Sequence, residues 1–251
     1  PSVWVGGVYM PNGTYLANGA TSTTTVKPSG GYAYYKDGTL TLNNYKYEGV
    51  GLPITNSLGT EFGTSVFCDA ALDIVLAGKN VLKQTDQDFD IYVMEDLYIT
   101  GDGSLDASEM LESQFGDVWI DSGTITVSAT GTGISASNGS LAISGGTVNA
   151  RLSACFDIEI AGGKVTAVSD YDAIRADRNI TIYGGTVTAK TSHKLGDDKY
   201  HTIRYGDSFT VVPSLSIRAS VDPDGTLGPY KAADHNTYDL IVIEAPAFTK
   251  Q

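Results

Sequence analysis

Carboxylates recur along this sequence at a spacing that could place them in one row. Polar side chains stand three residues before a repeating aliphatic position, at Asp73, Asp96, Asp117, Ser140, Asp157 and Asn179. If each repeat forms one turn of a coil, neighbouring carboxylates lie about 5 Å apart and repel each other by about 1 kcal/mol in water. A hard cation such as calcium would relieve that repulsion, which makes Asp73, Asp96, Asp117 and Asp157 candidate metal ligands. The structural alternative is that Asp, Asn and Ser begin strands because they accept hydrogen bonds from backbone N–H groups in turns.

Two aromatic residues accompany this row. Tyr98 and Trp119 each follow an aspartate of the row by two residues, and the alternation of side chains along a strand turns them outward. Rings on neighbouring coils form a flat apolar strip on which a sugar ring can stack. The candidate ligand-binding residues are therefore Tyr98, Trp119, Asp96, Asp117 and Asp121. Aromatic pairs on adjacent strands also stabilise sheets without any ligand, so both interpretations stay open.

A second group of charged residues has the types that a polysaccharide lyase needs. Asp170 and Asp177 bracket Arg175, and Lys164 precedes them in the chain. Arg175 or Lys164 could abstract a proton as a base while the aspartates hold a metal, although a salt-bridged turn has the same composition. No His-Glu-x-x-His, Gly-x-Ser-x-Gly or Cys-x-x-Cys motif occurs. The sequence therefore favours a binding protein over an enzyme, and no catalytic residue is assigned.

A repeat defines the elements that must position these side chains. Its clearest copies are residues 143–148, 160–165 and 182–187, each an aliphatic residue followed by a Gly-Gly corner and a second alternating segment. The aliphatic anchor stands at positions 76, 99, 120, 143, 160 and 182, so one repeat takes 17 to 23 residues. That period is too short for a βαβ unit or a propeller blade and suits one coil of a three-strand solenoid. The sequence predicts an all-β fold, a single-stranded right-handed parallel β-helix with β-rich N- and C-terminal caps.

Stacked coils would bury the repeating aliphatic residues in columns. One predicted column contains Leu76, Ile99, Ile120, Ile143, Ile160 and Ile182, and a second contains Leu105, Ile125, Val148, Val165 and Val187. We expect one domain over residues 1–251, with an N-terminal cap over 1–50, regular coils over 51–192 and a C-terminal cap over 193–251. A hairpin is expected at Asp37-Gly38. Cys68 and Cys155 are expected to be buried free thiols, about three coils apart and too distant for a disulfide.

Composition narrows the class of partner. The 251 residues include 16 basic and 29 acidic side chains, which gives a net charge of −13 and argues against binding to nucleic acid. The hydrophobic fraction of 41% is sufficient for a continuous core. No stretch of about 18 apolar residues occurs, so membrane insertion is not expected.

Several segments resemble a known group of proteins. The Val-Gly-Gly-Val start at residues 5–8, the Gly-Thr-Leu-Thr-Leu-Asn-Asn segment at 38–44, the Gly-Gly-Thr-Val coils and the Asp-Pro-Asp-Gly stretch at 222–225 resemble secreted or wall-attached β-helix proteins of Gram-positive bacteria, including gut species. The coils are similar to the calcium-associated carbohydrate-binding β-helix domains of cellulolytic clostridia, which are related in fold to pectate lyases. The resemblance implies a secreted or cell-surface location and binding of plant polysaccharide such as polygalacturonate, with calcium bridging acidic sugars to acidic side chains.

The leading hypothesis is therefore a cell-surface carbohydrate-binding or adhesin-like module, with polysaccharide as partner and calcium as the cofactor. A polysaccharide lyase or glycoside hydrolase on the same scaffold is the first alternative. A passive spacer or a protein-binding adhesin is the second.

Overall fold

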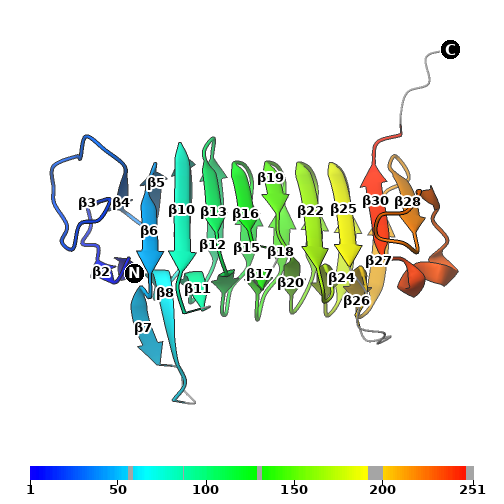
Figure 1. The fold of residues 1–251 in the computed structure, drawn as a ribbon, viewed down its shortest axis with the longest axis horizontal. Coiled ribbons are helices and arrows are strands. Elements are labelled where there is room, and N and C mark those ends of the chain that lie inside the picture. Colours follow the sequence, from blue (N-terminus) through cyan, green and yellow to red (C-terminus); the bar gives the residue numbers. More distant parts are fainter. Residues whose placement is uncertain (56–58, 87, 129–131, 192–199, 247–251) are drawn as a thin grey trace, which may run out of the picture.

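The computed structural model describes residues 1–55, 59–86, 88–128, 132–191 and 200–246. The chain forms an elongated body and passes repeatedly through three ten-stranded sheets (Figure 1). Successive strands belong to different sheets, and equivalent strands of successive coils pair in parallel, which is the arrangement of a β-helix. The one helix among the described residues is the short 3-10 helix η1 (Ala232–Thr237). The predicted all-β class with parallel coils is confirmed.

Each regular coil contributes one strand to each of three sheets, which we call A, B and C. Sheet A contains β8 (Glu61–Cys68), β11 (Phe89–Val93), β14 (Met110–Ser113), β17 (Gly133–Ala136), β20 (Leu152–Ala154), β23 (Ile174–Ala176) and β26 (Ile203–Tyr205). Sheet B contains β9 (Leu72–Ala77), β12 (Leu97–Gly101), β15 (Val118–Ile120), β18 (Leu141–Ile143), β21 (Ile158–Ile160), β24 (Asn179–Ile182) and β27 (Ser208–Val211). Sheet C contains β10 (Lys79–Gln84), β13 (Ser104–Ala107), β16 (Thr124–Val127), β19 (Thr147–Asn149), β22 (Lys164–Ser169) and β25 (Thr186–Thr191).

Aliphatic columns fill the interior along the body. The column of sheet C pairs Leu105, Ile125, Val148, Val165 and Val187 as predicted. The column of sheet B continues from Ile99 to Ile182, but its member in the first coil is Ile74, because Leu76 pairs with Gly101. The prediction for Leu76 is thus wrong by two residues. Both side chains are fully buried, and the longer strand β9 offers two inward aliphatic residues of the same parity.

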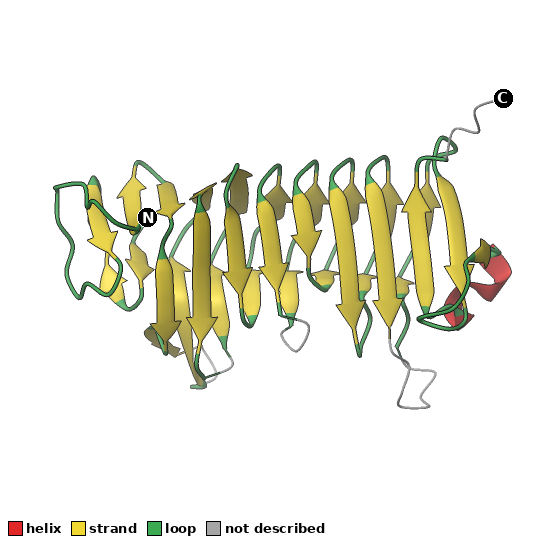
Figure 2. Ribbon diagram, turned by 45° about the horizontal axis from the view of Figure 1, so that its top comes forward, coloured by secondary structure: helices red, strands yellow, loops and turns green. Residues whose placement is uncertain are grey.

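The Gly-Gly corners connect sheet B to sheet C at the turns seen in Figure 2. The second glycine of each clear copy has a positive φ, +77° at Gly163 and +80° at Gly185. A Cβ atom at Gly163 would lie 2.6 Å from the carbonyl oxygen of Gly146, the equivalent glycine of the preceding coil. These glycines are therefore needed both for the left-handed backbone and for the close approach of stacked corners.

The N-terminal end is covered by antiparallel strands. β1 (Val3–Val5) joins β2 (Val8–Tyr9) and the edge of β8, while β7 (Leu52–Thr55) pairs with the other half of β8. In sheet B, β3 (Thr14–Ala17) pairs with β4 (Tyr32–Lys36), which forms the predicted hairpin with β5 (Thr39–Asn43) through Asp37 and Gly38, both at positive φ. Parallel pairing already begins with β5 on β9 and with β6 (Lys46–Gly49) on β10.

The C-terminal end continues sheet C with antiparallel strands. β30 (Leu240–Glu244) pairs with β25, then β28 (Ser216–Ser220) pairs with β30, and β29 (Gly228–Pro229) completes the edge. Helix η1 carries His235, whose ring contacts Tyr230 Oη at 2.8 Å and the carbonyl oxygen of Ile203 at 2.7 Å. These contacts fix the cap against the last strand of sheet A.

Both cysteines are free thiols, but only one is fully buried. Cys68 pairs with Val93 and faces the core. Ala154, not Cys155, occupies the equivalent inward position in its coil. Because side chains alternate along a strand, Cys155 lies one residue past the inward position and is partly exposed. The prediction that Cys155 points inward is wrong.

None of the described residues forms a helix with the length and apolar character that a membrane span requires.

Candidate functional site

The polar row identified in the sequence is a ladder of hydrogen bonds between coils. The backbone N–H of Asp117 donates to Asp96 Oδ1 at 2.9 Å, and that of Ser140 donates to Asp117 Oδ1 at 2.7 Å. Asp157 Oδ1 in turn accepts the backbone N–H and the side-chain amide of Asn179, at 3.1 and 2.9 Å. Each side chain thus accepts a hydrogen bond from the equivalent backbone of the next coil. Acceptance of backbone N–H groups is the structural role that the sequence offered as the alternative to metal binding.

Asp73 does not belong to this ladder. It stands inside strand β9, where it pairs with Tyr98 and points to solvent. The predicted alignment fails for Asp73 because it was counted from Leu76 instead of Ile74. Within the described ranges, no group of three or more His, Cys, Asp or Glu side chains converges as a metal site. Calcium binding at Asp96 and Asp117 stays a prediction.

Tyr98 and Trp119 lie side by side on the outer face of sheet B. They pair in register, their ring centroids are 6.2 Å apart, and both rings are half-buried. The hydroxyl of Tyr98 donates to Asp121, which also accepts from Ser144. The hydrogen bond to Asp121 raises the pKa of Tyr98. The structure therefore brings Tyr98, Trp119 and Asp121 together, with Asp121 already holding the phenol.

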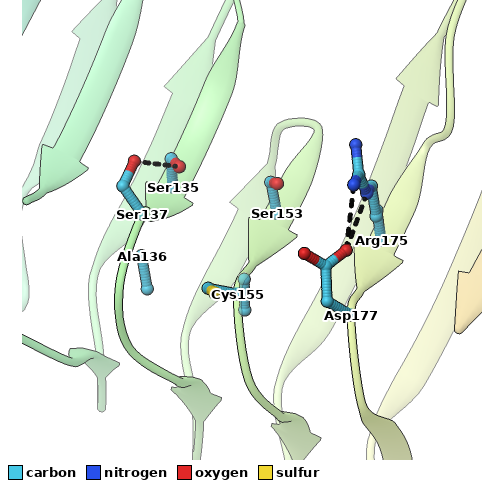
Figure 3. A pocket seen from close by; sticks show the side chains of 8 residues that line it. Ser135, Ala136, Ser137, Ser153, Cys155, Arg175 and Asp177 are labelled. Atoms are coloured by element: carbon cyan, nitrogen blue, oxygen red, sulfur yellow. Dashed lines mark hydrogen bonds and ion pairs between the residues drawn. The ribbon is translucent and has the colours of Figure 1, made fainter. Parts of the chain in front are cut away.

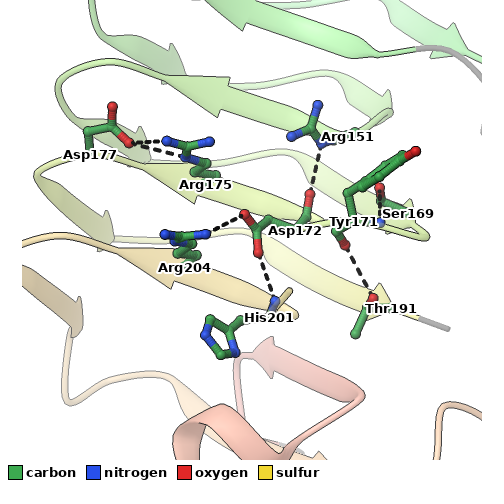
Figure 4. Close-up of polar contacts among 9 residues, drawn as sticks. All are labelled: Arg151, Ser169, Tyr171, Asp172, Arg175, Asp177, Thr191, His201 and Arg204. Atoms are coloured by element: carbon green, nitrogen blue, oxygen red, sulfur yellow. Dashed lines mark hydrogen bonds and ion pairs between the residues drawn. The ribbon is translucent and has the colours of Figure 1, made fainter. Parts of the chain in front are cut away.

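The residues of the lyase-like group lie at three separate places in the coils. Arg175 donates from Nε and Nη2 to Asp177 Oδ1 at 3.1 and 2.9 Å (Figure 4). Asp170 follows strand β22 at the corner between sheets C and A. Lys164 begins β22 in sheet C, between Thr147 and Thr186. The structure keeps Arg175 with Asp177 and places Lys164 on a different face.

A buried aspartate, Asp172, connects the coil that contains Arg175 to the coils before and after it. Asp172 is 2% exposed, and its Oδ1 accepts the backbone N–H of His201 at 2.7 Å. Its Oδ2 lies 3.6 Å from Arg204 Nη1, and its carbonyl oxygen accepts Arg151 Nε at 2.9 Å (Figure 4). Burial lowers the pKa of Arg151. Asp172 thus connects three successive coils through two arginines and one backbone amide.

The outer face of sheet A carries a row of side chains that the sequence interpretation missed. We call it the sheet A row. Its residues are in register from one end to the other: Trp4, Phe67, Tyr92, Glu112, Ser135, Ser153, Arg175 and Arg204. Aromatic residues occupy the N-terminal end, hydroxyls the middle and guanidinium groups the C-terminal end. The register was hidden because Tyr92 precedes its sheet B anchor by seven residues, whereas Glu112 and Ser135 precede theirs by eight. The connection between sheets A and B varies in length by one residue. A shift of one residue exchanges the inward-facing and outward-facing side chains of a strand.

The aromatic end of the sheet A row is continuous. Trp4 contacts Phe67 with ring centroids 5.5 Å apart, and Phe67 stacks on Tyr92 at 6.2 Å. Tyr9, which is half exposed, contacts Trp4 at 5.3 Å. The hydroxyl of Tyr92 donates to Gln114 Oε1 at 2.7 Å, and burial raises the pKa of Tyr92 to about 12.

A depression of about 180 Å³ lies over the middle of the same row. It is lined by Ser135, Ala136, Ser137, Ser153, Ala154, Cys155, Arg175 and Asp177. Figure 3 shows the serine hydroxyls and the Arg175–Asp177 pair on adjacent strands around this space. Hydroxyls both donate and accept hydrogen bonds, whereas the Arg–Asp pair offers a donor and an acceptor of opposite charge. The depression can therefore satisfy a ligand that carries several hydroxyl groups.

Glu112 separates the rings from the depression. It is 6% exposed although it points to the outer face, and burial raises its pKa. It pairs with Tyr92 in the preceding coil and with Ser135 in the next. Asp177 lies three coils further along the body, so Glu112 and Asp177 are about 14 Å apart along the axis. That separation exceeds the distance between the two carboxylates of a glycosidase.

Comparison with known proteins gives one match. Residues 180–196, which include most of strand β24 and all of β25, match a family model described as a beta helix repeat. This match agrees with the three parallel sheets. No curated protein and no solved structure matches the chain significantly.

Proposed function

We propose that this protein is a carbohydrate-binding module, secreted or held at the cell surface, which binds polysaccharide on the outer face of sheet A. The observation that carries the proposal is the common register of stacked rings and a hydroxyl-lined depression along one row. We also propose that the coils wind as one right-handed helix, because nearly all connections between parallel strands of one sheet are right-handed.

The chemistry of sugars explains why this combination is favourable. A pyranose ring has an apolar face of C–H groups, which packs on an aromatic ring, and a rim of hydroxyls, which requires polar partners. Trp4 and Phe67 supply half-buried rings, and Ser135, Ser153 and Arg175 supply hydrogen-bonding groups. Ligand sites commonly combine apolar lining with a few placed polar groups.

The Tyr98–Trp119 strip on sheet B is the second candidate for the same function. Its rings are adjacent and half-buried, but the phenol of Tyr98 is bonded to Asp121. The neighbouring Asp96 and Asp117 each accept a backbone N–H group from the next coil. Fewer polar groups are therefore available to a sugar there than in the depression of sheet A. Calcium-assisted binding of acidic polysaccharide at this strip stays part of the proposal.

Titration calorimetry with neutral and acidic oligosaccharides, each with and without calcium, tests the function. We expect binding to at least one series, a loss of about tenfold in affinity on Arg175→Ala, and no change on Tyr98→Ala. An effect of Tyr98→Ala alone would move the site to sheet B. No heat with any sugar, with or without calcium, would refute the function.

A lyase on the same face is the alternative that Arg175 and Asp177 favour. Their ion pair lies in the depression, although Lys164 belongs to sheet C. Incubation with polygalacturonate distinguishes the two functions, because a lyase forms unsaturated products that absorb ultraviolet light. Absorbance that grows with time and is lost in Arg175→Ala would establish the enzyme.

A further inference from the structure

A small cavity, which we call the cap cavity, lies between the last strand of sheet A and the C-terminal cap. It has a volume of about 200 Å³ and is lined by His201, Ile203, Arg204, Tyr205 and Asn236. The first four residues belong to β26 or directly precede it, and Asn236 lies on helix η1. Sites for drug-sized ligands measure roughly 300–1,000 Å³, so the cap cavity fits only a small molecule.

The cap cavity contains hydrogen-bonding groups that the folded chain leaves unused. Nδ1 of His201 is buried and has no hydrogen-bond partner among the described residues, which destabilises the folded state. The guanidinium group of Arg204 lies 3.6 Å from Asp172 Oδ2, and its side chain is 44% exposed (Figure 4). Arg204 and the amide of Asn236 can both donate hydrogen bonds, and so can His201 in the tautomer with its proton on Nδ1. A ligand that accepts hydrogen bonds therefore satisfies all three side chains.

The charges beside the cap cavity favour a ligand with a single negative charge. The carboxylate of Asp172 is buried next to Arg204, and the carbonyl oxygen of Asp172 accepts Arg151 Nε at 2.9 Å. Two guanidinium groups (+2) and one carboxylate (−1) leave an excess of one positive charge, although the whole chain carries −13. A monoanion balances this excess, whereas a doubly charged phosphate is repelled more strongly by Asp172. A carboxylate also matches the planar two-point geometry of a guanidinium group.

We propose that the cap cavity binds a small organic acid through its carboxylate. The carboxylate accepts hydrogen bonds from Arg204, Asn236 and His201. Because β26 and η1 supply these groups jointly, the bound acid also connects the C-terminal cap to the last coil. The cap cavity shares no lining residue with the depression of sheet A, so this site is independent of the proposed sugar site.

Nuclear magnetic resonance of the histidine rings tests the proposal. The chain has three histidines, and the ring signals that disappear in His201→Gln belong to His201. Lactate and galacturonate, added at constant pH and ionic strength, represent a hydroxy acid and a sugar acid. We expect at least one of them to move the His201 signals with saturation, and the acid that saturates at the lower concentration identifies the source. The uncharged lactamide and galacturonate methyl ester should leave the signals in place.

Two results of this titration would overturn the proposal. One is the absence of a saturable shift with both acids. The other is saturation by chloride or phosphate at concentrations as low as those of the acids, because any anion would then suffice. Neither result bears on sugar binding at sheet A, which is measured separately by calorimetry.

Substitutions locate the bound carboxylate. Asn236→Ala changes an exposed residue of η1 and should weaken binding about fivefold, and Arg204→Gln should weaken it at least about tenfold. The matched control is Arg178→Gln, which removes the same charge from an exposed side chain that packs on Phe156 outside the cavity. We expect the control to keep wild-type affinity. Wild-type affinity in Asn236→Ala, or an equal loss in Arg178→Gln and Arg204→Gln, would contradict the proposal.

Discussion

Single carboxylates in this protein have roles that depend on their surroundings. Asp86, Asp88 and Asp90 are regularly spaced in the sequence, but only Asp90 is fully buried. It accepts the backbone N–H groups of Glu109 at 2.6 Å and of Gln84 at 3.0 Å. It therefore joins two consecutive coils. Asp90 is thus a buried structural residue and does not belong to a solvated acidic loop.

Asp90 should make stability depend on pH. Burial raises its pKa from 3.8 to about 6, so the folded state holds this proton more tightly than the unfolded state. Its contribution to stability is complete below about pH 4 and is lost as the pH rises through 6, a difference of about 3 kcal/mol. The Asp90→Asn substitution should lower the free energy of unfolding more at pH 4 than at pH 8. We expect the two losses to differ by about 3 kcal/mol. Chemical denaturation at both values measures it, and an equal loss at both would contradict the assignment.

The polar ladder makes a prediction that separates structure from calcium binding. Asp117→Ala removes the acceptor of the Ser140 N–H group and should lower the free energy of unfolding by about 1–2 kcal/mol. Glu159→Ala, an exposed position on the same sheet, should change it by less than about 0.5 kcal/mol. Thermal denaturation with and without calcium completes the test. A calcium-dependent rise in Tm that disappears in Asp117→Ala would show that this carboxylate also holds the ion.

The two thiols should differ in reactivity. Cys155 is partly exposed in the depression of sheet A, while Cys68 is buried and burial raises its pKa to about 11. Since the thiolate is the reactive form, an aromatic disulfide reagent should titrate one thiol quickly in the native protein. The fast equivalent should vanish in Cys155→Ser and remain in Cys68→Ser. Two fast equivalents would contradict the burial of Cys68.

At the scale of elements, the glycine corners limit how closely coils can stack. Gly163→Ala combines strain at a φ of +77° with a Cβ contact of 2.6 Å to the Gly146 carbonyl oxygen. Gly13 has the same φ of +77° and no atom within 4 Å of its Cβ position, so Gly13→Ala measures the backbone strain alone. We expect Gly13→Ala to lower the free energy of unfolding by about 1–2 kcal/mol and Gly163→Ala to lower it by at least twice as much. Equal losses in chemical denaturation would mean that the corners do not constrain stacking.

The sequence predicted the strands that follow a connection of constant length. The corner from sheet B to sheet C contains Gly-Gly in the clear copies, so the register of Val148, Val165 and Val187 followed directly. The corner from sheet A to sheet B varies by one residue, and a shift of one residue exchanges inward and outward side chains. The placement of Cys155 and the sheet A row could not be predicted for that reason. Trp4 joins the row through an antiparallel strand, which no repeat indicates.

At the scale of the whole molecule, coils stack along one axis and each contacts its neighbours. The polar row predicted on sheet B, apart from Asp73, forms a ladder in which side-chain oxygens accept backbone N–H groups of the next coil. The outer face of sheet A instead presents rings and hydroxyls in sequence along the body. A solenoid can thereby extend a ligand site by adding coils, since every coil contributes one residue to each outer row.

The tryptophans allow the central claim to be tested by one measurement. The chain has two, Trp4 on the row of sheet A and Trp119 on sheet B. Emission is recorded during titration with a binding oligosaccharide in Trp119→Phe, which retains Trp4, and in Trp4→Phe, which retains Trp119. Binding on sheet A predicts that the emission of Trp4 changes with saturation while that of Trp119 stays constant. A saturable change at Trp119 with none at Trp4 would contradict it.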